Sequence, residues 1–261
     1  MHGAGNSFVI TEGDEAGSGN YPETARSLCG GVYDGFIVVC PYEGDDADFR
    51  MLFYNSDGTL GEMCGNGARC VARYGFEHGY APDPDNIRIM TTAGLVTGRR
   101  ITGELYRVRL NDPSVLIKDC TASVPGGEEK CSYTELGNPG IPHAVVKCTQ
   151  EELSDTEALR QRGRNLRYSE TFPKGANVTF AVPLGGNTIK AVTYERGVED
   201  FTLACGTGSG ATAISCSAWE LIDGSTADID MPGGRLRIEF SRDGDTFSDI
   251  YLTGPTAYIT E

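Results

Sequence analysis

The sequence predicts an α+β protein that is rich in strands and built from two similar halves. Three observations lead to this prediction. Short apolar runs recur between turn residues, segments with helical periodicity are few, and one motif occurs twice. A length of 261 residues suits one large domain or two smaller ones, and a hydrophobic content of 39% allows a substantial core.

Nine segments have the β-branched and aromatic content of strands and are bounded by turn residues. They are 36–40, 49–54, 87–92, 105–110, 144–147, 178–182, 189–194, 236–240 and 250–253. Helices are expected at 22–28 and at 151–160, the second with Thr149 and Glu152 spaced as a capping box. Many strands and few helices favour an α+β or barrel-like architecture over a doubly wound parallel sheet. Residues 124–130 are expected to form a polar loop.

The repeated motif is Cys-Gly-x-Gly. In the first half a strand ends at Asn55, a turn follows, and the motif begins at Cys64. In the second half a strand ends near Tyr194, a turn follows, and the motif begins at Cys205. Helix-forming sequence comes after both copies. The echo predicts two similar domains, 1–112 and 113–253, divided at the turn-rich segment 111–114.

Charge and cysteine usage exclude several classes of function. A net charge of −15 argues against nucleic acid or an anionic membrane surface as a partner. The nine cysteines have no CxxC spacing, so no metal site is expected. The sequence has no apolar run long enough to span a membrane and no secretory signal, which predicts a cytoplasmic protein with reduced thiols.

A cysteine at the start of a helix is suited to acid–base chemistry. Free backbone N–H groups and the positive end of the helix dipole gather there, so we expect a depressed thiol pKa. The same N–H groups can bind a carboxylate, and glycines let it approach the backbone. Two such starts facing one α-carbon would place a sulfur on each face. One thiolate would remove the α-proton and the opposite thiol would return a proton, which inverts the configuration.

The motif allows other interpretations. A single glycine-rich loop is usually a tight turn, and a lone cysteine is usually a packing residue; the pairing of the motifs favours chemistry. A phosphate-binding loop would have a different glycine pattern. A thiol-redox protein would have CxxC, whereas Cys64 and Cys70 are not so spaced. A non-catalytic binding module stays open, and it would keep its ligand when either cysteine is substituted.

Four motifs, in order along the chain, resemble those of the diaminopimelate epimerase family. The opening Met-His-Gly-Ala-Gly-Asn-Ser-Phe at 1–8 is similar to that family's first motif. The others are Tyr-Asn-Ser-Asp-Gly at 54–58 followed by Glu-Met-Cys-Gly-Asn-Gly-Ala-Arg-Cys at 62–70, Lys-Gly-Ala-Asn-Val at 174–178, and Tyr-Glu-Arg-Gly at 194–197 followed by Ala-Cys-Gly-Thr-Gly at 204–208. Together they span almost the whole chain.

The resemblance implies a fold of two pseudosymmetric domains, each a curled mixed β-sheet around a central helix. Residues 254–261 would return to the first domain, and the active site would lie in the cleft between the domains. It also implies an isomerase that epimerises LL-diaminopimelate to meso-diaminopimelate, for lysine and peptidoglycan precursor biosynthesis, without pyridoxal phosphate or another cofactor. The partner would be a small amino-acid substrate. The oligomeric state is left open, a homodimer included.

The site residues follow from the same resemblance. Cys64 and Cys205 would be the acid–base pair. The reacting carboxylate would bind at Gly65, Asn66, Gly206 and Thr207, the rest of the substrate at Asn6, Asn55, Asn177 and Arg196, and Glu195 and His143 would flank the thiols. Each has a plainer interpretation: Asn55 and Asn177 as turn residues, Arg196 in an exposed ion pair, His143 as a hydrogen-bonded core histidine.

Two positions depart from the family pattern. Ser7 stands where the family has Asp, and Ile141 stands before Pro142-His143 where the family has Asn. Asn138 lies just upstream and is expected to replace the missing amide in part. These departures concern the substrate more than the reaction, so a racemase of another amino acid, such as histidine, is the alternative.

Overall fold

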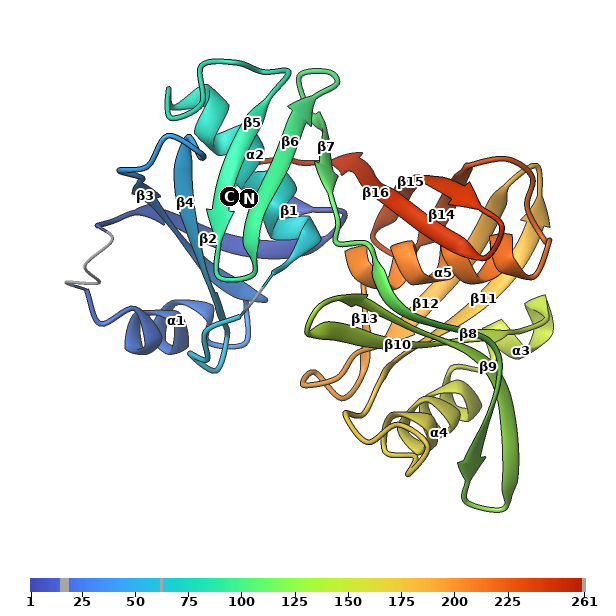
Figure 1. Ribbon diagram of the computed structural model, residues 1–261. Coiled ribbons are helices and arrows are strands. Elements are labelled where there is room, and N and C mark those ends of the chain that lie inside the picture. The colour runs from blue at the N-terminus through green and yellow to red at the C-terminus, as the bar shows by residue number, and fades with distance from the viewer. Residues whose placement is uncertain (15–18, 62, 260–261) are drawn as a thin grey trace. The chain divides into compact units, whose positions relative to one another are not determined.

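The computed structural model describes residues 1–14, 19–61 and 63–259 (Figure 1). Glu62 of the second motif and residues 260–261 of the expected returning segment lie outside these ranges. The chain forms two compact units, Met1–Arg109 with Thr253–Glu261, and Leu110–Leu252. Each unit is described separately below.

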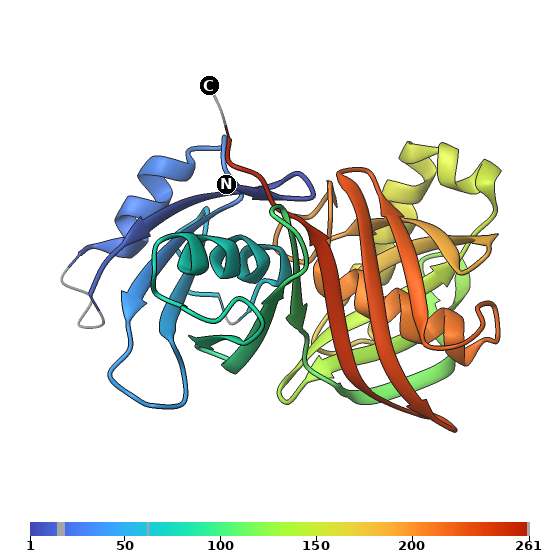
Figure 2. The same ribbon diagram turned by 90° about the horizontal axis from the view of Figure 1, so that it is seen from above.

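The first unit is a mixed sheet that curls around one helix. Its strands follow one another in the order of the sequence, and β2–β3 and β4–β5 are parallel pairs. Helix α2 contacts all seven strands, which is why the sheet wraps around it (Figures 1 and 2). The elements are β1 (His2–Gly3), β2 (Asn6–Glu12), α1 (Tyr21–Cys29), β3 (Gly35–Pro41), β4 (Phe49–Asn55), α2 (Gly65–Glu77), β5 (Ile87–Thr91), β6 (Gly94–Arg100) and β7 (Leu105–Arg109).

Small residues allow α2 to lie close to the sheet. Gly65 to Ala72 of this helix are all buried. At Gly75 a Cβ atom would lie 2.4 Å from the ring of Phe49, so only glycine fits between α2 and β4 without a shift. The helix therefore supplies the centre of the first unit, and its first turn holds Cys64 at a fixed place beside the sheet.

The end of the chain joins the first unit. Strand β16 (Thr246–Pro255) begins in the second unit, and its last residues belong to the first. Beyond it, His2 and Ala257 form an antiparallel bridge, and Thr256 donates a hydrogen bond of 2.9 Å from Oγ1 to the carbonyl of Glu104. Arg73 on α2 donates to the carbonyl of Thr256 at 2.8 Å.

The second unit is also a mixed sheet around one helix. Its strand order is β16-β15-β14-β12-β11-β10-β9-β8, with β13 paired to β12, and the pairs β10–β11 and β12–β14 are parallel. Helix α5 contacts β9, β10, β11, β14 and β15. The elements are β8 (Pro113–Val124), β9 (Gly127–Gly137), β10 (Gly140–Lys147), α3 (Gln150–Ser154), α4 (Thr156–Arg167), β11 (Asn177–Gly185), β12 (Thr188–Tyr194), β13 (Phe201–Thr202), α5 (Gly206–Ala218), β14 (Thr226–Met231), β15 (Gly234–Asp243) and β16.

Burial of β11 shows where the core of the second unit lies. Its first six residues are all buried, because α5 and α4 both pack on this strand. Val178, Phe180 and Val182 join the apolar cluster with Leu159 and Leu166 of α4. Alternate residues of a strand point to opposite faces, so a continuous buried run is expected for a strand that is covered on both.

The expected fold class, an α+β protein of two mixed sheets each curled around a central helix, is confirmed, although the sheet does not close into a barrel. The single helix expected at 151–160 is wrong. Asp155 accepts a hydrogen bond from the Ala158 amide and caps α4, which separates it from α3. The capping box of Thr149 and Glu152 is present at α3.

The polar loop expected at 124–130 is also wrong. Val124 of β8 pairs with Gly127 of β9, so only Pro125 and Gly126 form the turn. The hydrophobic pattern did not indicate these strands, because β8 is an edge strand that is half exposed and carries polar residues.

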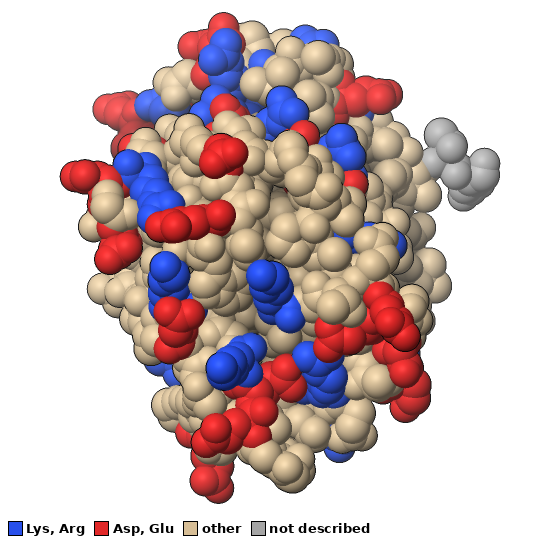
Figure 3. All heavy atoms as spheres, turned by 90° about the vertical axis from the view of Figure 1, so that its right-hand side faces the viewer, with Lys and Arg blue, Asp and Glu red and all other residues tan. Residues whose placement is uncertain are grey.

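Acidic and basic side chains are interspersed on the face drawn in Figure 3, although the net charge is −15. The ion pairs Arg235–Asp230 and Arg237–Asp228 join the neighbouring strands β14 and β15. Among the described residues, no helix is long and apolar enough to cross a membrane.

Candidate functional site

Both repeated motifs place a cysteine at the N-cap of a central helix. Cys64 precedes α2 with φ −126° and ψ 111°, and Cys205 precedes α5 with φ −119° and ψ 112°. The amide of Gly67 donates to Sγ of Cys64 at 3.4 Å, and the amide of Gly208 donates to Sγ of Cys205 at 3.3 Å. A sulfur takes the place of the usual capping oxygen in each case. The two units therefore present the same local geometry, as the repeat predicts.

Asn6, the first residue of β2, contacts the first cysteine. Its Oδ1 atom lies 3.8 Å from Sγ of Cys64 and accepts a hydrogen bond of 3.2 Å from Nδ2 of Asn66. Asn66 is buried in the first turn of α2, next to the buried Gly65. Three of the residues that the resemblance implies for the first unit are thus in direct contact.

Arg69 is a buried charge that the sequence analysis did not single out. It is fully buried on α2, and burial lowers its pKa to about 10. Nη1 donates to the carbonyl of Gly65 at 3.4 Å, whereas Nε and Nη2 have no partner among the described residues. The side chain fits because Gly3 has no Cβ, which would lie 3.2 Å from Nη2. The sequence does contain a signal for this buried residue, because an arginine stands within a run of small residues.

The second cysteine faces an anion. Burial, followed by the charge of Glu195, raises the pKa of Cys205 well above its ordinary value. The Gly208 amide and the hydroxyl of Thr207, 3.7 Å from Sγ, act in the opposite direction but do not outweigh them. The depressed thiol pKa expected at a helix start is therefore wrong for Cys205. Glu195 is itself held by Thr202, whose Oγ1 donates to Oε1 at 2.5 Å.

Asn177 and Arg196 are in contact at the start of β11. Oδ1 of Asn177 accepts from the backbone amide of Arg196 at 2.8 Å, and its Nδ2 donates to the carbonyl of Pro142 at 3.3 Å. The guanidinium of Arg196 donates from Nη1 to the carbonyl of Lys174 at 2.9 Å. Among the described residues Arg196 makes no ion pair, so the plainer interpretation of this side chain does not hold.

His143 is buried but not hydrogen-bonded. It lies on β10 opposite Asn177 of β11 and Thr134 of β9. Neither ring nitrogen has a hydrogen-bond partner within the part of the chain that the structure describes. Burial, with a smaller contribution from the charge of Arg196, lowers the pKa of His143 to about 3. The interpretation as a hydrogen-bonded core histidine is wrong, and a buried imidazole without partners calls for a functional explanation.

Four other predicted or departing residues lie in local surroundings of their own. Nδ2 of Asn55 donates to Oγ1 of Thr59 at 2.9 Å, which is a turn interaction. Ser7, which replaces the family's Asp, donates from its amide and hydroxyl to Oδ2 of Asp34 at 2.6 and 3.0 Å. A carboxylate therefore stands beside this position after all. Asn138 is exposed in the turn between β9 and β10, and Ile141 is half-buried on β10.

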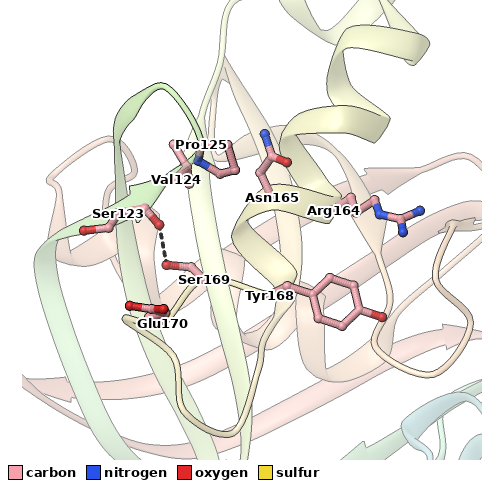
Figure 4. Close-up of a pocket in the computed structure, with 8 residues that line it drawn as sticks. All are labelled: Ser123, Val124, Pro125, Arg164, Asn165, Tyr168, Ser169 and Glu170. Carbon is pink, nitrogen blue, oxygen red and sulfur yellow. Dashed lines mark hydrogen bonds between the residues drawn. The ribbon is translucent and has the colours of Figure 1, made fainter.

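A pocket of about 420 Å³ lies elsewhere in the second unit (Figure 4). The end of α4, the loop after it and the tip of the β8–β9 hairpin form its walls, and Ser169 donates to the carbonyl of Ser123 at 2.7 Å. None of the predicted site residues lines it. The lining residues are Ser123, Val124, Pro125, Arg164, Asn165, Tyr168, Ser169 and Glu170.

Known proteins resemble this chain along nearly its whole length. The sequence profile of the diaminopimelate epimerase family matches residues 1–105 and 136–259. The chain is 37% identical to a diaminopimelate epimerase from Archaeoglobus fulgidus, over 99% of this chain and 92% of that protein. It is 34% identical to one from Aquifex aeolicus, over 100% of this chain and 95% of that protein.

Solved structures show the same fold at lower identity. A PhzF-family phenazine biosynthesis protein from Bacillus anthracis aligns with a TM-score of 0.69 at 15% identity, over 95% of this chain and 91% of that one. A hydroxyproline epimerase from Agrobacterium vitis aligns with a TM-score of 0.65 at 18% identity, over 85% and 72%. The solved structures show the fold alone, whereas the sequence matches also cover both cysteine motifs. They show that this chain belongs to the diaminopimelate epimerase family.

Proposed function

We propose that this protein epimerises LL-diaminopimelate to meso-diaminopimelate with Cys64 and Cys205 as its acid–base pair. Family membership supports the reaction. The observation that carries the mechanism is the pair of thiol-capped helix starts, one in each unit, with matching backbone angles. The proposal requires the two units to bring both sulfurs to opposite faces of one α-carbon.

The proposed chemistry is a proton exchange at that carbon. One sulfur, as the thiolate, removes the α-proton and becomes a thiol. The other sulfur, as a thiol, delivers its proton to the opposite face and becomes the thiolate, so the pair exchanges roles with each turnover. Backbone amides at Gly65–Asn66 and Gly206–Thr207 lie in the first turns of α2 and α5, where they are suited to holding the α-carboxylate as charge develops.

We assign the distal end of the substrate to polar side chains near these helix starts. That end carries an ammonium and a carboxylate, which cannot be buried without partners. Arg196 can bind a carboxylate through two parallel hydrogen bonds, and Asn6, Asn55, Asn177 and Asn138 offer amides. Glu195 and His143 would act on the thiols rather than on the distal end. Action without pyridoxal phosphate or metal, and a cytoplasmic location, remain parts of this proposal.

Ile141 favours a second candidate. An apolar side chain at the position of the family's Asn would suit a less polar substrate, so a racemase of another amino acid, histidine among them, is the alternative.

The test is α-proton exchange in D₂O, followed by NMR, with diaminopimelate and a panel of other amino acids. We expect diaminopimelate to exchange fastest. Faster exchange of another amino acid would preserve the two-thiol chemistry and refute the substrate. Absence of exchange with every amino acid would refute both.

A further inference from the structure

A chain of hydrogen bonds runs from β9 to the guanidinium of Arg196. It begins at Glu135, whose side chain is only 10% exposed. Oε1 accepts from the hydroxyl of Tyr133 and Oε2 accepts from Nζ of Lys174, both at 2.7 Å. Burial acts to raise the pKa of Glu135, but these two hydrogen bonds outweigh it and lower the pKa. The carboxylate is therefore ionised and paired at neutral pH.

The segment before β11 is attached to β9 at two points. The ring of Phe172 stacks on that of Tyr133, with centroids 4.9 Å apart and planes 6° from parallel. Lys174, two residues further on, reaches Glu135. The amide of Gly175 donates to the carbonyl of Phe172 at 2.7 Å and closes a tight turn that contains Lys174. The backbone of Lys174 is thus fixed relative to the sheet.

The fixed backbone of Lys174 holds Arg196. Its carbonyl accepts the hydrogen bond from Nη1 of Arg196, and Asn177, three residues later, accepts from the Arg196 amide. Both the main chain and the side chain of Arg196 are therefore bound to one short segment. A neutral carbonyl occupies only part of the guanidinium and leaves its charge available for an anion.

We propose that Glu135 is a positioning residue that acts through Lys174 to hold Arg196 in the orientation that binds the distal carboxylate of the substrate. This inference rests on the proposed function. An arginine that is free to rotate loses side-chain entropy on binding, and one that is already oriented loses less. Two parallel hydrogen bonds to a carboxylate also require a defined plane for the guanidinium. Glu135 would contribute to affinity without touching the substrate.

The variants Glu135→Gln and Lys174→Met test this inference. Each removes the ion pair and keeps the carbonyl that Arg196 contacts. We expect KM for diaminopimelate to rise by roughly 3- to 10-fold, the worth of one hydrogen bond, with kcat changed by less than about 2-fold. The matched control is Glu129→Gln, also on β9, which loses the 2.7 Å ion pair to Arg162 and should leave KM unchanged. Unchanged KM in both test variants would overturn the inference.

A double-mutant cycle separates positioning from general weakening of the strand. In an Arg196→Ala background, Glu135→Gln should not raise KM further, because the side chain through which it acts is gone. An undiminished effect in that background would overturn the inference.

A measurement without substrate tests the positioning of Arg196 separately from the proposed function. Hydrogen exchange of the Arg196 side-chain N–H groups, followed by ¹⁵N NMR, should be faster in Glu135→Gln and in Lys174→Met than in the unmodified protein and in Glu129→Gln. Lys174 is half exposed, so its variant tests the point even if Glu135→Gln does not fold. Equal exchange in all four proteins refutes the positioning role. If diaminopimelate is not a substrate, the proposed function fails, and the exchange rates still decide this point.

Discussion

The backbone amide of Gly208 donates a hydrogen bond of 3.3 Å to Sγ of Cys205, yet the sulfur remains a thiol. Burial and the nearby Glu195 outweigh the helix start and raise the pKa of Cys205. In the proposed mechanism, Cys205 would therefore be the sulfur that carries a proton before the substrate binds.

We expect alkylation of Cys205 by iodoacetamide to accelerate continuously from pH 7 to pH 10, because the thiolate is the reactive form. Glu195→Gln should increase the rate at pH 8, since removal of the anion lowers the thiol pKa. Mass spectrometry of the Cys205 peptide measures both rates, and the buried Cys216 on the same helix serves as the control. A rate that levels off below pH 8 would contradict the raised pKa.

Replacement of either motif cysteine should abolish turnover. A hydroxyl is far less acidic than a thiol, so Cys64→Ser and Cys205→Ser should each lose at least about 100-fold in epimerisation rate. The assay is inversion of diaminopimelate with the purified variants. Cys216→Ala should retain turnover, because this residue is buried on α5 and lies outside the motif. Near-normal turnover in either serine variant would rule out the two-thiol mechanism.

His143 should make the protein sensitive to acid. Its pKa is about 3 in the folded state and ordinarily 6.5, so below pH 6.5 the unfolded chain binds a proton that the folded chain does not. The free energy of unfolding should therefore decrease as the pH falls from 6.5, by up to about 1.4 kcal/mol per pH unit, or roughly 2 kcal/mol at pH 5.

Urea unfolding at pH 7 and pH 5 measures this decrease in the free energy of unfolding. In His143→Gln the decrease should be smaller by roughly 2 kcal/mol, because the titrating imidazole is gone. The same pH dependence in both proteins would mean that other groups cause the acid sensitivity.

Asn138 should matter more for the substrate than Ile141. If the Asn138 amide replaces the one that the family has before the Pro-His pair, Asn138→Ala should raise KM for diaminopimelate by up to about 10-fold. Ile141→Ala should change KM little. Steady-state kinetics of the two variants decide the matter, and the reverse order of effects would support the alternative substrate.

The sequence predicted the features that depend on local residue types. Strands buried on both faces, such as β11, were visible as apolar runs, and both helix starts followed from Cys-Gly-x-Gly. Strand β14, which has a polar face, was missed, although its neighbour β15 was predicted at 236–240. In β14 and β15 the acidic and basic residues pair across the strands, as Asp228 does with Arg237 at 2.7 Å, and such pairing cannot be recognised before the strands are known to be neighbours.

The electrostatics of the site depended on contacts that no single motif contains. A helix start alone implies a reactive thiol. The pKa of Cys205, however, is raised by burial and by Glu195, which lies ten positions earlier in the chain. Arg69 lies inside a recognised motif, yet only its packing reveals a buried cation, two of whose nitrogens have no partner within the described part of the chain. Likewise, the role of Glu135 depends on a loop that returns to β9.

The bridge between His2 and Ala257 has a consequence for synthesis on the ribosome. Residues 1–109 emerge before residues 253–259, and the contacts of the first unit are complete only when the later segment has been made. The second unit also needs β16. A nascent chain that has not reached this segment therefore exposes unpaired strand edges, which can pair with other chains and aggregate. Translation of this one short segment therefore completes the strand pairing of both units.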